Sequence, residues 1–172
     1  MSSARLFAST LGCAAVALTI CWRAQPPFVL NLTASVPVGL YLRSAEALRV
    51  GDLAVASLPP AYRDLAHRRG YLPRHYQLVK IVAARAGDAV CRMGSRVWIA
   101  GYAAVWTRRT DNAGQPLPAW QGCRVLKAHE TFILGAHTNS FDSRYFGPID
   151  RRFVIGRAIP ILVCGTANTI PK

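Results

Sequence analysis

The chain has 172 residues, of which 21 are Lys or Arg and 8 are Asp or Glu, so its formal net charge is +13. Charged residues nevertheless make up only 17% of the sequence, whereas apolar residues make up 52%. This composition excludes a disordered basic tail, which would be far poorer in apolar residues. The length allows one domain with a real core and excludes two large catalytic domains.

The positive charge comes almost entirely from arginine, which supplies 18 of the 21 basic residues. These residues are scattered in singles and pairs, such as Arg68-Arg69 and Arg151-Arg152, and no nucleic-acid-binding motif is present. We therefore expect no nucleic-acid partner. Attraction to anionic lipid headgroups or acidic partners is the interpretation that we favour.

The N-terminal region contains an uncharged stretch of 17 residues, Leu6 to Trp22, between two arginines. As a helix it would span about 25 Å, against about 30 Å for a hydrocarbon core. It reads as an uncleaved membrane anchor, with a cleavable secretory signal and a buried core helix as the alternatives. The first two interpretations both predict that residues 1–25 are an anchor or signal and that residues 26–172 form an exported domain.

Three cysteines follow the apolar stretch: Cys91, Cys123 and Cys164. In an oxidising compartment we expect a disulfide between Cys91 and Cys123, because both lie in the middle section, whereas Cys164 follows the last predicted strand. There is no CxxC pair, and the four histidines are too dispersed for a metal signature, so we expect no metal site.

The rest of the chain has the pattern of a mainly β domain. Short runs rich in Val, Ile, Leu, Tyr and Trp alternate with Gly, Pro, Asp and Asn. One helix is predicted, Pro60 to Arg69, and Thr107 to Gln121 is expected to be an exposed loop or hairpin. The predicted strands are Phe28 to Leu32, Gly39 to Arg43, Leu53 to Leu58, Gln77 to Ala83, Ala89 to Met93, Val97 to Ala100, Ala103 to Trp106, Thr131 to Leu134 and Phe153 to Val163.

Lys80 lies at the centre of the most apolar of these strands, in Leu-Val-Lys-Ile-Val. Burying a charged, unpaired lysine is costly, but a desolvated lysine can lose its proton, whereas arginine stays charged. Lysine at this position in an arginine-rich chain fits a general base. The alternative is an alternating strand whose lysine points to solvent.

Two further segments carry polar groups suited to chemistry. Ser35 precedes a turn that Pro37 and Gly39 require, so its hydroxyl is expected to be exposed at the end of an extended segment. The stretch Gly135 to Gly147 gathers hydroxyls, amides, one Asp and one Arg in one loop. Taken alone, each is also explained as an ordinary turn.

Together these segments resemble the sequence boxes of the bacterial type I signal peptidases, and in particular their conjugative-transfer branch. The likeness rests on Ser35 with Pro37 and Gly-Leu-Tyr, on Lys80 followed by Arg-x-Gly-Asp, and on Asn-Ser-x-Asp-Ser-Arg-Tyr-x-Gly from Asn139 to Gly147. The resemblance implies a signal-peptidase-like fold of coiled antiparallel sheets with one short helix, preceded by an N-terminal membrane-spanning or signal helix. It implies no cofactor.

The resemblance also implies a role for each residue of the boxes. Ser35 would be the acylating nucleophile and Lys80 its general base. Thr33 would join the Ser35 backbone N–H in the oxyanion hole, and Ser140 would orient the lysine amine. Asp142, regarded as essential in the conjugative branch, would pair with Arg144 and hold the loop near the dyad.

The implied substrate is a conjugative pilin precursor, trimmed at its C-terminus and cyclised in some systems. The other implied partners are inner membrane lipid and further pilus-assembly proteins. The implied location is the periplasmic face of the inner membrane, or the periplasm if the N-terminal segment is cleaved.

Two features of the sequence differ from ordinary signal peptidases and favour a narrow substrate: Val36, and the run from Gly135 to Thr138. The alternatives are a general type I signal peptidase and a non-enzymatic pilus-assembly scaffold. A self-cleaving repressor would need a DNA-binding module and no membrane segment.

The substrate is expected to bind as an added β-strand between Phe28 to Thr33 and Arg74 to Val79. Two shallow apolar pockets would accept small side chains, so Phe or Trp there should lower kcat/KM at least about tenfold. The residues expected to line this cleft are Phe28, Val29, Leu30, Tyr76, Gln77 and Leu78.

Overall fold

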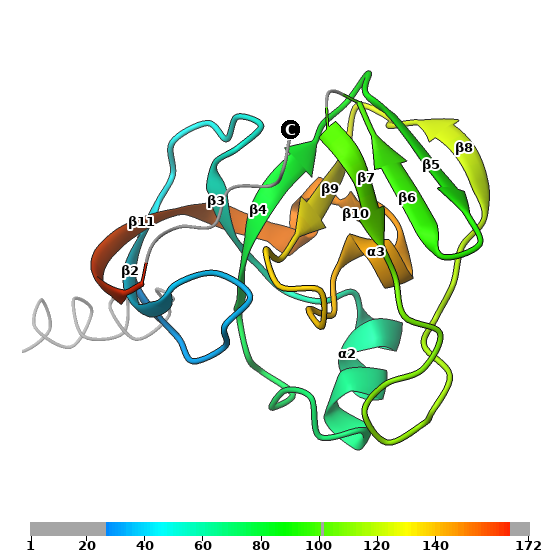
Figure 1. Ribbon diagram of the computed structural model, residues 1–172. Helices are drawn as coiled ribbons and strands as arrows, with labels where there is room; N and C mark the ends of the chain where they lie inside the picture. Colours follow the sequence, from blue (N-terminus) through cyan, green and yellow to red (C-terminus); the bar gives the residue numbers. More distant parts are fainter. Residues whose placement is uncertain (1–26, 101, 166–172) are drawn as a thin grey trace, which may run out of the picture.

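The computed structural model describes residues 27–100 and 102–165, and they form two antiparallel sheets with few helices (Figure 1). The larger sheet has seven strands in the order β1-β2-β11-β3-β4-β9-β10, and the smaller has four in the order β7-β6-β5-β8. The predicted mainly β class is confirmed for this part of the chain. The expected anchor, Leu6 to Trp22, lies outside the described residues, and no helix within them is long and apolar enough to cross a membrane.

The strands of the larger sheet come from both ends of the described chain. Its last long strand, β11, lies between β2 and β3 and so ties the C-terminal part to the N-terminal part. The bounds are β1 Phe28–Asn31, β2 Val38–Ser44, β3 Leu53–Ala56, β4 Leu78–Ala84, β9 Glu130–Leu134, β10 Ile149–Asp150 and β11 Val154–Cys164.

In the smaller sheet β5, β6 and β7 form a meander, and β8 returns to the other edge, where a disulfide joins it to β5. Cys91 and Cys123 face each other on neighbouring strands and are bonded, and Cys164 is free and exposed, so the predicted pairing is confirmed. The fully exposed strand β8 was not predicted, because Gly-Cys-Arg-Val has neither an apolar run nor a buried face. The bounds are β5 Ala89–Met93, β6 Arg96–Ile99, β7 Tyr102–Trp106 and β8 Gly122–Val125.

The main helix, α2, spans Pro60–Arg68, close to the predicted range. Its first turn uses Pro60, where the missing N–H costs nothing, and Gly70 follows with a φ of 67°. The short elements α3 (Ser143–Phe146) and η1 (Arg151–Phe153) were not predicted. Both begin after an aspartate whose side chain accepts a backbone N–H two residues on.

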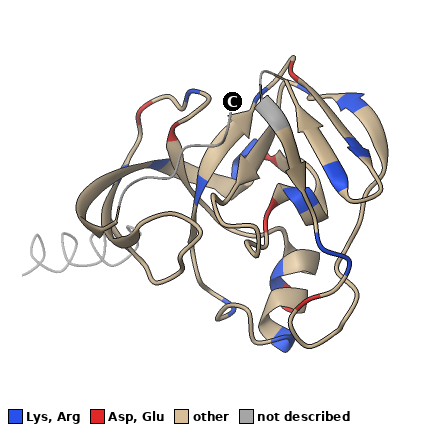
Figure 2. Cartoon of the chain, viewed as in Figure 1, with Lys and Arg blue, Asp and Glu red and all other residues tan. Residues whose placement is uncertain are grey.

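Two apolar clusters hold these layers together. The larger includes Val79 and Phe132 from the seven-stranded sheet and Val90 and Val97 from the four-stranded sheet, so the sheets share one core. A second cluster lies under α2, where Ala66 packs among residues of β3, β4 and β9. Lys and Arg residues, by contrast, are spread along both sheets, α2 and the loops (Figure 2).

The larger sheet curls, so its edge strand β1 returns toward the chain that leads into β4. The Tyr76 hydroxyl, two residues before β4, hydrogen-bonds to the backbone of Leu30 and Leu32. Three strands separate β1 from β4 within the sheet. The curl therefore brings the segment around Ser35 close to the strand that carries Lys80.

Candidate active site

Ser35 lies in a tight turn that a buried asparagine organises. The Asn31 side-chain amide donates to the carbonyls of Thr33 at 2.9 Å, Val36 at 3.2 Å and Pro37 at 3.1 Å. The Tyr41 hydroxyl donates to the same Pro37 carbonyl. Asn31 is only 1% exposed, so this turn is fixed from inside the protein.

The Ser35 hydroxyl lies 2.9 Å from the Thr33 hydroxyl. Thr33 also donates to the Asn31 side-chain oxygen at 3.0 Å. When the single Thr33 proton is used in that bond, Ser35 is the donor to Thr33. The turn therefore holds the two hydroxyls next to each other.

Lys80 is buried at the centre of β4, whose seven residues are all buried. Its side chain does not point to solvent: the residue is 2% exposed, which excludes the alternating-strand alternative. The amine donates to the Ser140 hydroxyl at 2.6 Å. The pKa of Lys80 is lowered to about 8, mainly by burial; the Asp142 carboxylate opposes this shift and the Arg144 guanidinium adds to it.

Gly135 lies where the Ser35 turn and the Ser140 loop meet. A Cβ atom at this position would lie 2.2 Å from the Ser140 hydroxyl oxygen and 2.9 Å from the Ser35 Cβ. The next residue, Ala136, donates its N–H to the Ser35 carbonyl at 2.7 Å. The missing side chain thus lets Ser35 and Ser140 approach the same point from two sides.

Asp142 and Arg144 close the loop that carries Ser140. Asp142 is fully buried and accepts from the Gly135 N–H at 2.8 Å and from the Arg144 side chain at 2.6 and 2.9 Å. Arg144 in turn donates to the carbonyls of Gly135 at 3.2 Å and His137 at 2.7 Å. The Asp142–Arg144 ion pair therefore holds both ends of the loop, and Asp142 is not hydrogen-bonded to Lys80.

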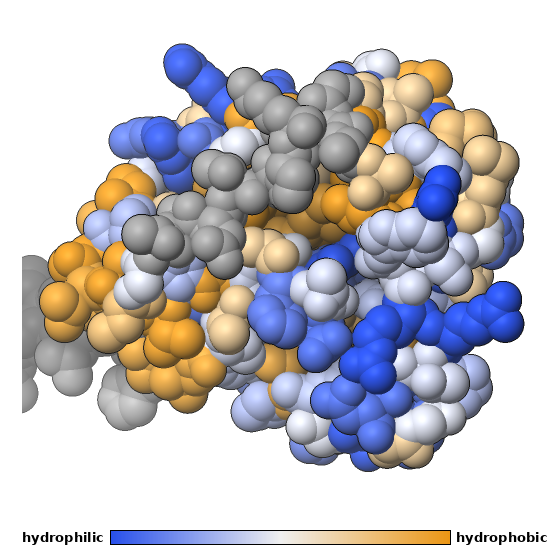
Figure 3. Space-filling view, viewed as in Figure 1, coloured by the Kyte–Doolittle hydropathy of each residue, from blue (hydrophilic) through white to orange (hydrophobic). Residues whose placement is uncertain are grey.

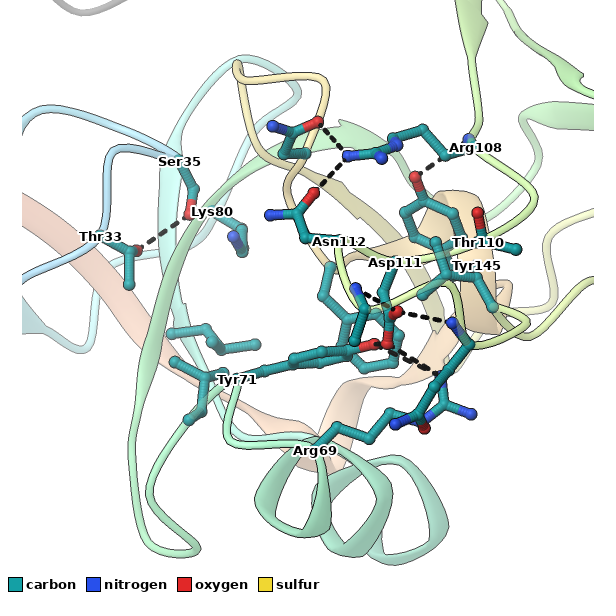
Figure 4. A pocket seen from close by; sticks show the side chains of 17 residues that line it. Thr33, Ser35, Arg69, Tyr71, Lys80, Arg108, Thr110, Asp111, Asn112 and Tyr145 are labelled. Carbon is teal, nitrogen blue, oxygen red and sulfur yellow. Dashed lines mark hydrogen bonds and ion pairs between the residues drawn. The ribbon is translucent and has the colours of Figure 1, made fainter.

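Ser35, Thr33 and Lys80 line one end of a cavity of about 400 Å³ (Figure 4). Ser35 and Lys80 are not hydrogen-bonded to each other within the described part of the chain, an arrangement that does not exclude a catalytic role, because such bonds often form only with substrate present. The cavity's far wall is the loop between β7 and β8, predicted only as an exposed loop. The Asp111 carboxylate in that loop accepts from the Tyr71 hydroxyl and lies 3.6 Å from Arg69.

The predicted substrate-binding residues fall into two groups. Phe28 and Leu30 are more than half exposed on β1, whereas Val29 between them is 5% exposed and packs in the core. On the other side, Leu78 lines the cavity. Strand β9 pairs with β4 only from Ile81 onward, so Leu78 to Lys80 have one edge free of β9. Tyr76 and Gln77 lie just before β4.

Three supporting residues escaped prediction: Asn31, Gly135 and Arg92. The buried guanidinium of Arg92, on β5, donates to the Arg144 carbonyl at 2.6 Å and to the Thr107 hydroxyl at 3.3 Å. Its burial lowers its pKa. A polar residue at the end of an apolar strand is a sequence signal for Asn31, but nothing local distinguishes Arg92 from the other arginines.

Comparison with known proteins gives a consistent family. Residues 2–163 match the family described as signal peptidase, peptidase S26. A plasmid transfer protein TraF from Escherichia coli is 32% identical over 145 residues, covering 77% of this chain and 81% of that protein. A conjugal transfer protein TraF from Agrobacterium tumefaciens is 32% identical over 173 residues, covering 94% and 92%.

Among solved structures, a signal peptidase I from Enterococcus faecalis has a TM-score of 0.37 and 20% identity, covering 66% of this chain and 98% of that one. The assignment rests on the sequence matches, which span nearly the whole chain. This chain belongs to the signal peptidase S26 family and is related to the TraF proteins of conjugal transfer.

Proposed function

We propose that this protein is a membrane-associated serine endopeptidase that processes a pilin precursor during conjugative transfer, with Ser35 as nucleophile and Lys80 as general base. One observation carries the proposal. A fully buried lysine, whose pKa is lowered to about 8, shares a cavity with a serine held in a rigid turn. A scaffold gains nothing from an unpaired buried lysine, which costs stability whenever it is charged.

In the proposed acylation step, neutral Lys80 takes the proton of the Ser35 hydroxyl as its oxygen attacks the scissile carbonyl. The developing oxyanion accepts hydrogen bonds from the Ser35 N–H and from the Thr33 hydroxyl, which turns away from Asn31. Protonated Lys80 then gives its proton to the leaving amine, and the C–N bond breaks. The Ser140 hydroxyl keeps the Lys80 amine oriented by accepting a hydrogen bond from it.

In the second step an acceptor attacks the acyl carbonyl while Lys80 removes the acceptor's proton; the bond from that carbonyl to the Ser35 oxygen breaks, and Lys80 returns the proton to Ser35. If the acceptor is water, the product is a linear peptide. If it is the substrate's own N-terminal amine, the product is a cyclic peptide that is lighter by one water. The choice depends on which nucleophile reaches the acyl-enzyme first.

The proposed location is supported by an apolar surface. Six side chains of β1, β2, β11 and the nucleophile turn are between 37% and 73% exposed: Phe28, Leu30, Leu32, Val38, Ile161 and Leu162. Figure 3 shows apolar side chains gathered over this end of the molecule. Such a surface, which includes the strand that follows the predicted anchor in sequence, fits contact with the lipid of the inner membrane, where a membrane-inserted precursor would present its cleavage site.

A general signal peptidase remains the second candidate, because the family match carries that description. The departures around Ser35 and the relatives in conjugal transfer favour the narrower substrate. The two candidates differ in substrate while sharing the same chemistry.

The deciding experiment is mass spectrometry of a candidate pilin precursor, and of an ordinary secreted preprotein, each made with this protein. We expect the pilin alone to be shortened. Ser35→Ala and Lys80→Ala should abolish the change, whereas Ser95→Ala and Lys127→Ala, at positions outside the cavity lining, should not. Processing of the preprotein alone would favour the second candidate, and processing by either dyad variant would refute the mechanism.

A further inference from the structure

The edge strand β1 has backbone groups that its neighbour β2 does not use. In the β1–β2 ladder Val29 faces Tyr41 and Asn31 faces Gly39. Because β1 pairs with no other strand of residues 27–100 and 102–165, alternate residues present their N–H and C=O groups at the free edge. The Leu30 carbonyl and the Leu32 N–H are such groups, and they lie shortly before Ser35.

A single side chain satisfies both groups. The Tyr76 hydroxyl accepts from the Leu32 N–H at 2.8 Å and donates to the Leu30 carbonyl at 3.1 Å. The position of Tyr76 is fixed from its own backbone, whose N–H donates to the Pro73 carbonyl at 3.0 Å. Tyr76 thus reaches β1 from the turn that precedes β4.

This pair of hydrogen bonds reproduces one step of a β-ladder. In a parallel bridge, one residue faces a residue of the neighbouring strand. Its N–H donates to the carbonyl of the residue before the facing one, and its C=O accepts from the N–H of the residue after the facing one. Here the facing residue would be Asn31, and the Tyr76 hydroxyl supplies the donor and the acceptor that a peptide residue would supply. The hydroxyl therefore occupies a backbone position on the edge where the substrate is proposed to bind.

We propose that Tyr76 is a specificity-determining gate: the backbone of the incoming peptide displaces the Tyr76 hydroxyl from β1. Only a peptide residue with a free N–H can replace the hydrogen bond that the hydroxyl donates to the Leu30 carbonyl. This inference rests on the proposed function, because it assumes that the peptide adds to β1. A proline or an N-methylated residue at the position facing Asn31 would leave the Leu30 carbonyl without its donor. The gate thus selects by backbone chemistry, separately from any choice of small side chains.

The test compares the full chain with Tyr76→Phe, which removes the hydroxyl and keeps the ring. The substrate is a peptide spanning the pilin cleavage site, with small residues next to the scissile bond, assayed unmodified and N-methylated at each residue in turn on the acyl side. Binding is measured in parallel in the Ser35→Ala background, where no turnover is needed. The matched control is Tyr62→Phe, whose ring packs on Phe146 in α3.

We expect Tyr76→Phe to lower KM, and the Kd in the Ser35→Ala background, by about fivefold with kcat unchanged, because the peptide no longer has to break two hydrogen bonds. N-methylation at one position should weaken binding about tenfold, and hydrogen exchange of the Leu32 amide in the free protein should be faster in Tyr76→Phe. A merely structural role would instead lower kcat or stability without lowering KM.

The outcomes separate this inference from the proposed function. Cleavage by the unmodified protein, with KM and Kd unaltered or raised in Tyr76→Phe, overturns the gate and leaves the peptidase standing. Absence of cleavage, with tighter binding in the Tyr76→Phe background, retains the gate and removes the peptidase. A peptide that binds none of the variants overturns both.

Discussion

Two buried basic side chains, Lys80 in the middle of β4 and Arg144 in α3, have opposite electrostatic surroundings. They are 2% and 3% exposed. Arg144 forms an ion pair with Asp142 and donates to three carbonyl oxygens, whereas the amine of Lys80 donates to a neutral hydroxyl. Burial would lower the pKa of both, but the Asp142 carboxylate raises that of Arg144, while the pKa of Lys80 stays low, at about 8.

The difference shows how one site can hold two buried basic residues with different properties. Arg144 stays charged and ties the loop, whereas Lys80 on β4 can lose its proton near neutral pH. A carboxylate close enough to neutralise Arg144 also interacts with Lys80, yet its hydrogen bonds all go to the arginine and the loop backbone. The pKa of Lys80 therefore stays low because the Asp142 carboxylate forms its ion pair with Arg144 and not with the Lys80 amine. Four experiments test this difference between Lys80 and Arg144: changes to Lys80, Asp142 and Gly135, and a change of pH.

Replacing Lys80 should have the largest effect. Lys80→Arg converts the base into a second permanent cation, so kcat/KM should fall at least about a thousandfold in a peptide cleavage assay. Lys80→Met should be as inactive but more stable than the unmodified protein. The folded-state pKa lies below the unfolded value of 10.5, so the charged lysine costs on the order of 3 kcal/mol below pH 8.

That gain in stability has a defined pH window. Between pH 8 and 10.5 the unfolded chain binds the Lys80 proton and the folded chain does not, so the stability of the unmodified protein rises with pH across this range. The advantage of Lys80→Met should therefore be full below pH 8 and vanish above 10.5. Denaturant unfolding at pH 7 and pH 10.5 measures it, and equal differences at both would contradict a neutral buried lysine.

Asp142→Asn should unfold or strongly destabilise the protein, because it leaves Arg144 buried without its carboxylate. We expect a loss of about 3 to 5 kcal/mol in the free energy of unfolding. The double variant Asp142→Asn, Arg144→Met should recover much of that loss but little activity, because the loop that carries Ser140 is no longer tied. Full activity in the double variant would show that the ion pair serves stability alone.

Gly135→Ala tests whether activity depends on the close approach of Ser35 to Ser140, the residue whose hydroxyl holds the Lys80 amine. The added Cβ would overlap with Ser140 and crowd Ser35, so one of the two must move. We expect kcat to fall about ten- to a hundredfold with a smaller change in KM, since a misplacement of about 1 Å costs that much. Gly87→Ala is a control for activity, because no atom lies within 4 Å of its added Cβ, although its φ of 90° strains the variant.

The smallest and most gradual effect is the pH dependence of the unmodified protein. With a pKa of about 8, roughly a tenth of Lys80 is neutral at pH 7. The logarithm of kcat/KM should therefore rise by about one for each pH unit below 8 and level off above it. A profile that is flat between pH 6 and 9 would argue against a lysine base in the free enzyme.

Local sequence patterns predicted much of the fold and singled out the lysine that the structure buries. The apolar runs gave most strands, Pro60 and Gly70 bounded the helix, and Lys80 was recognisable because a titratable residue interrupts an apolar strand. β8 and α3 were not predicted because each has a partner far along the chain: Cys91, which is bonded to Cys123 of β8, and Arg92, whose guanidinium donates to the Arg144 carbonyl in α3.

The cavity wall was missed for the same reason. Its placement depends on Tyr71 and Asp111, which are 40 residues apart, and on the Arg69 side chain that donates to Pro116. The bond between Tyr76 and β1 likewise needs the curl of the whole sheet. Periodicity reports which face of an element is buried, but it does not report which distant loop covers that face.

The disulfide between Cys91 and Cys123 gives the cavity wall a property useful for engineering. It joins the two ends of a segment that contains β6, β7 and the loop from Thr107 to Gln121, while Ser35, Lys80 and Asp142 lie outside that segment. The segment is therefore a covalently closed cassette. Exchanging it for the corresponding segment of a TraF relative would replace the far wall in one step and leave Ser35, Lys80 and the Asp142–Arg144 ion pair unchanged.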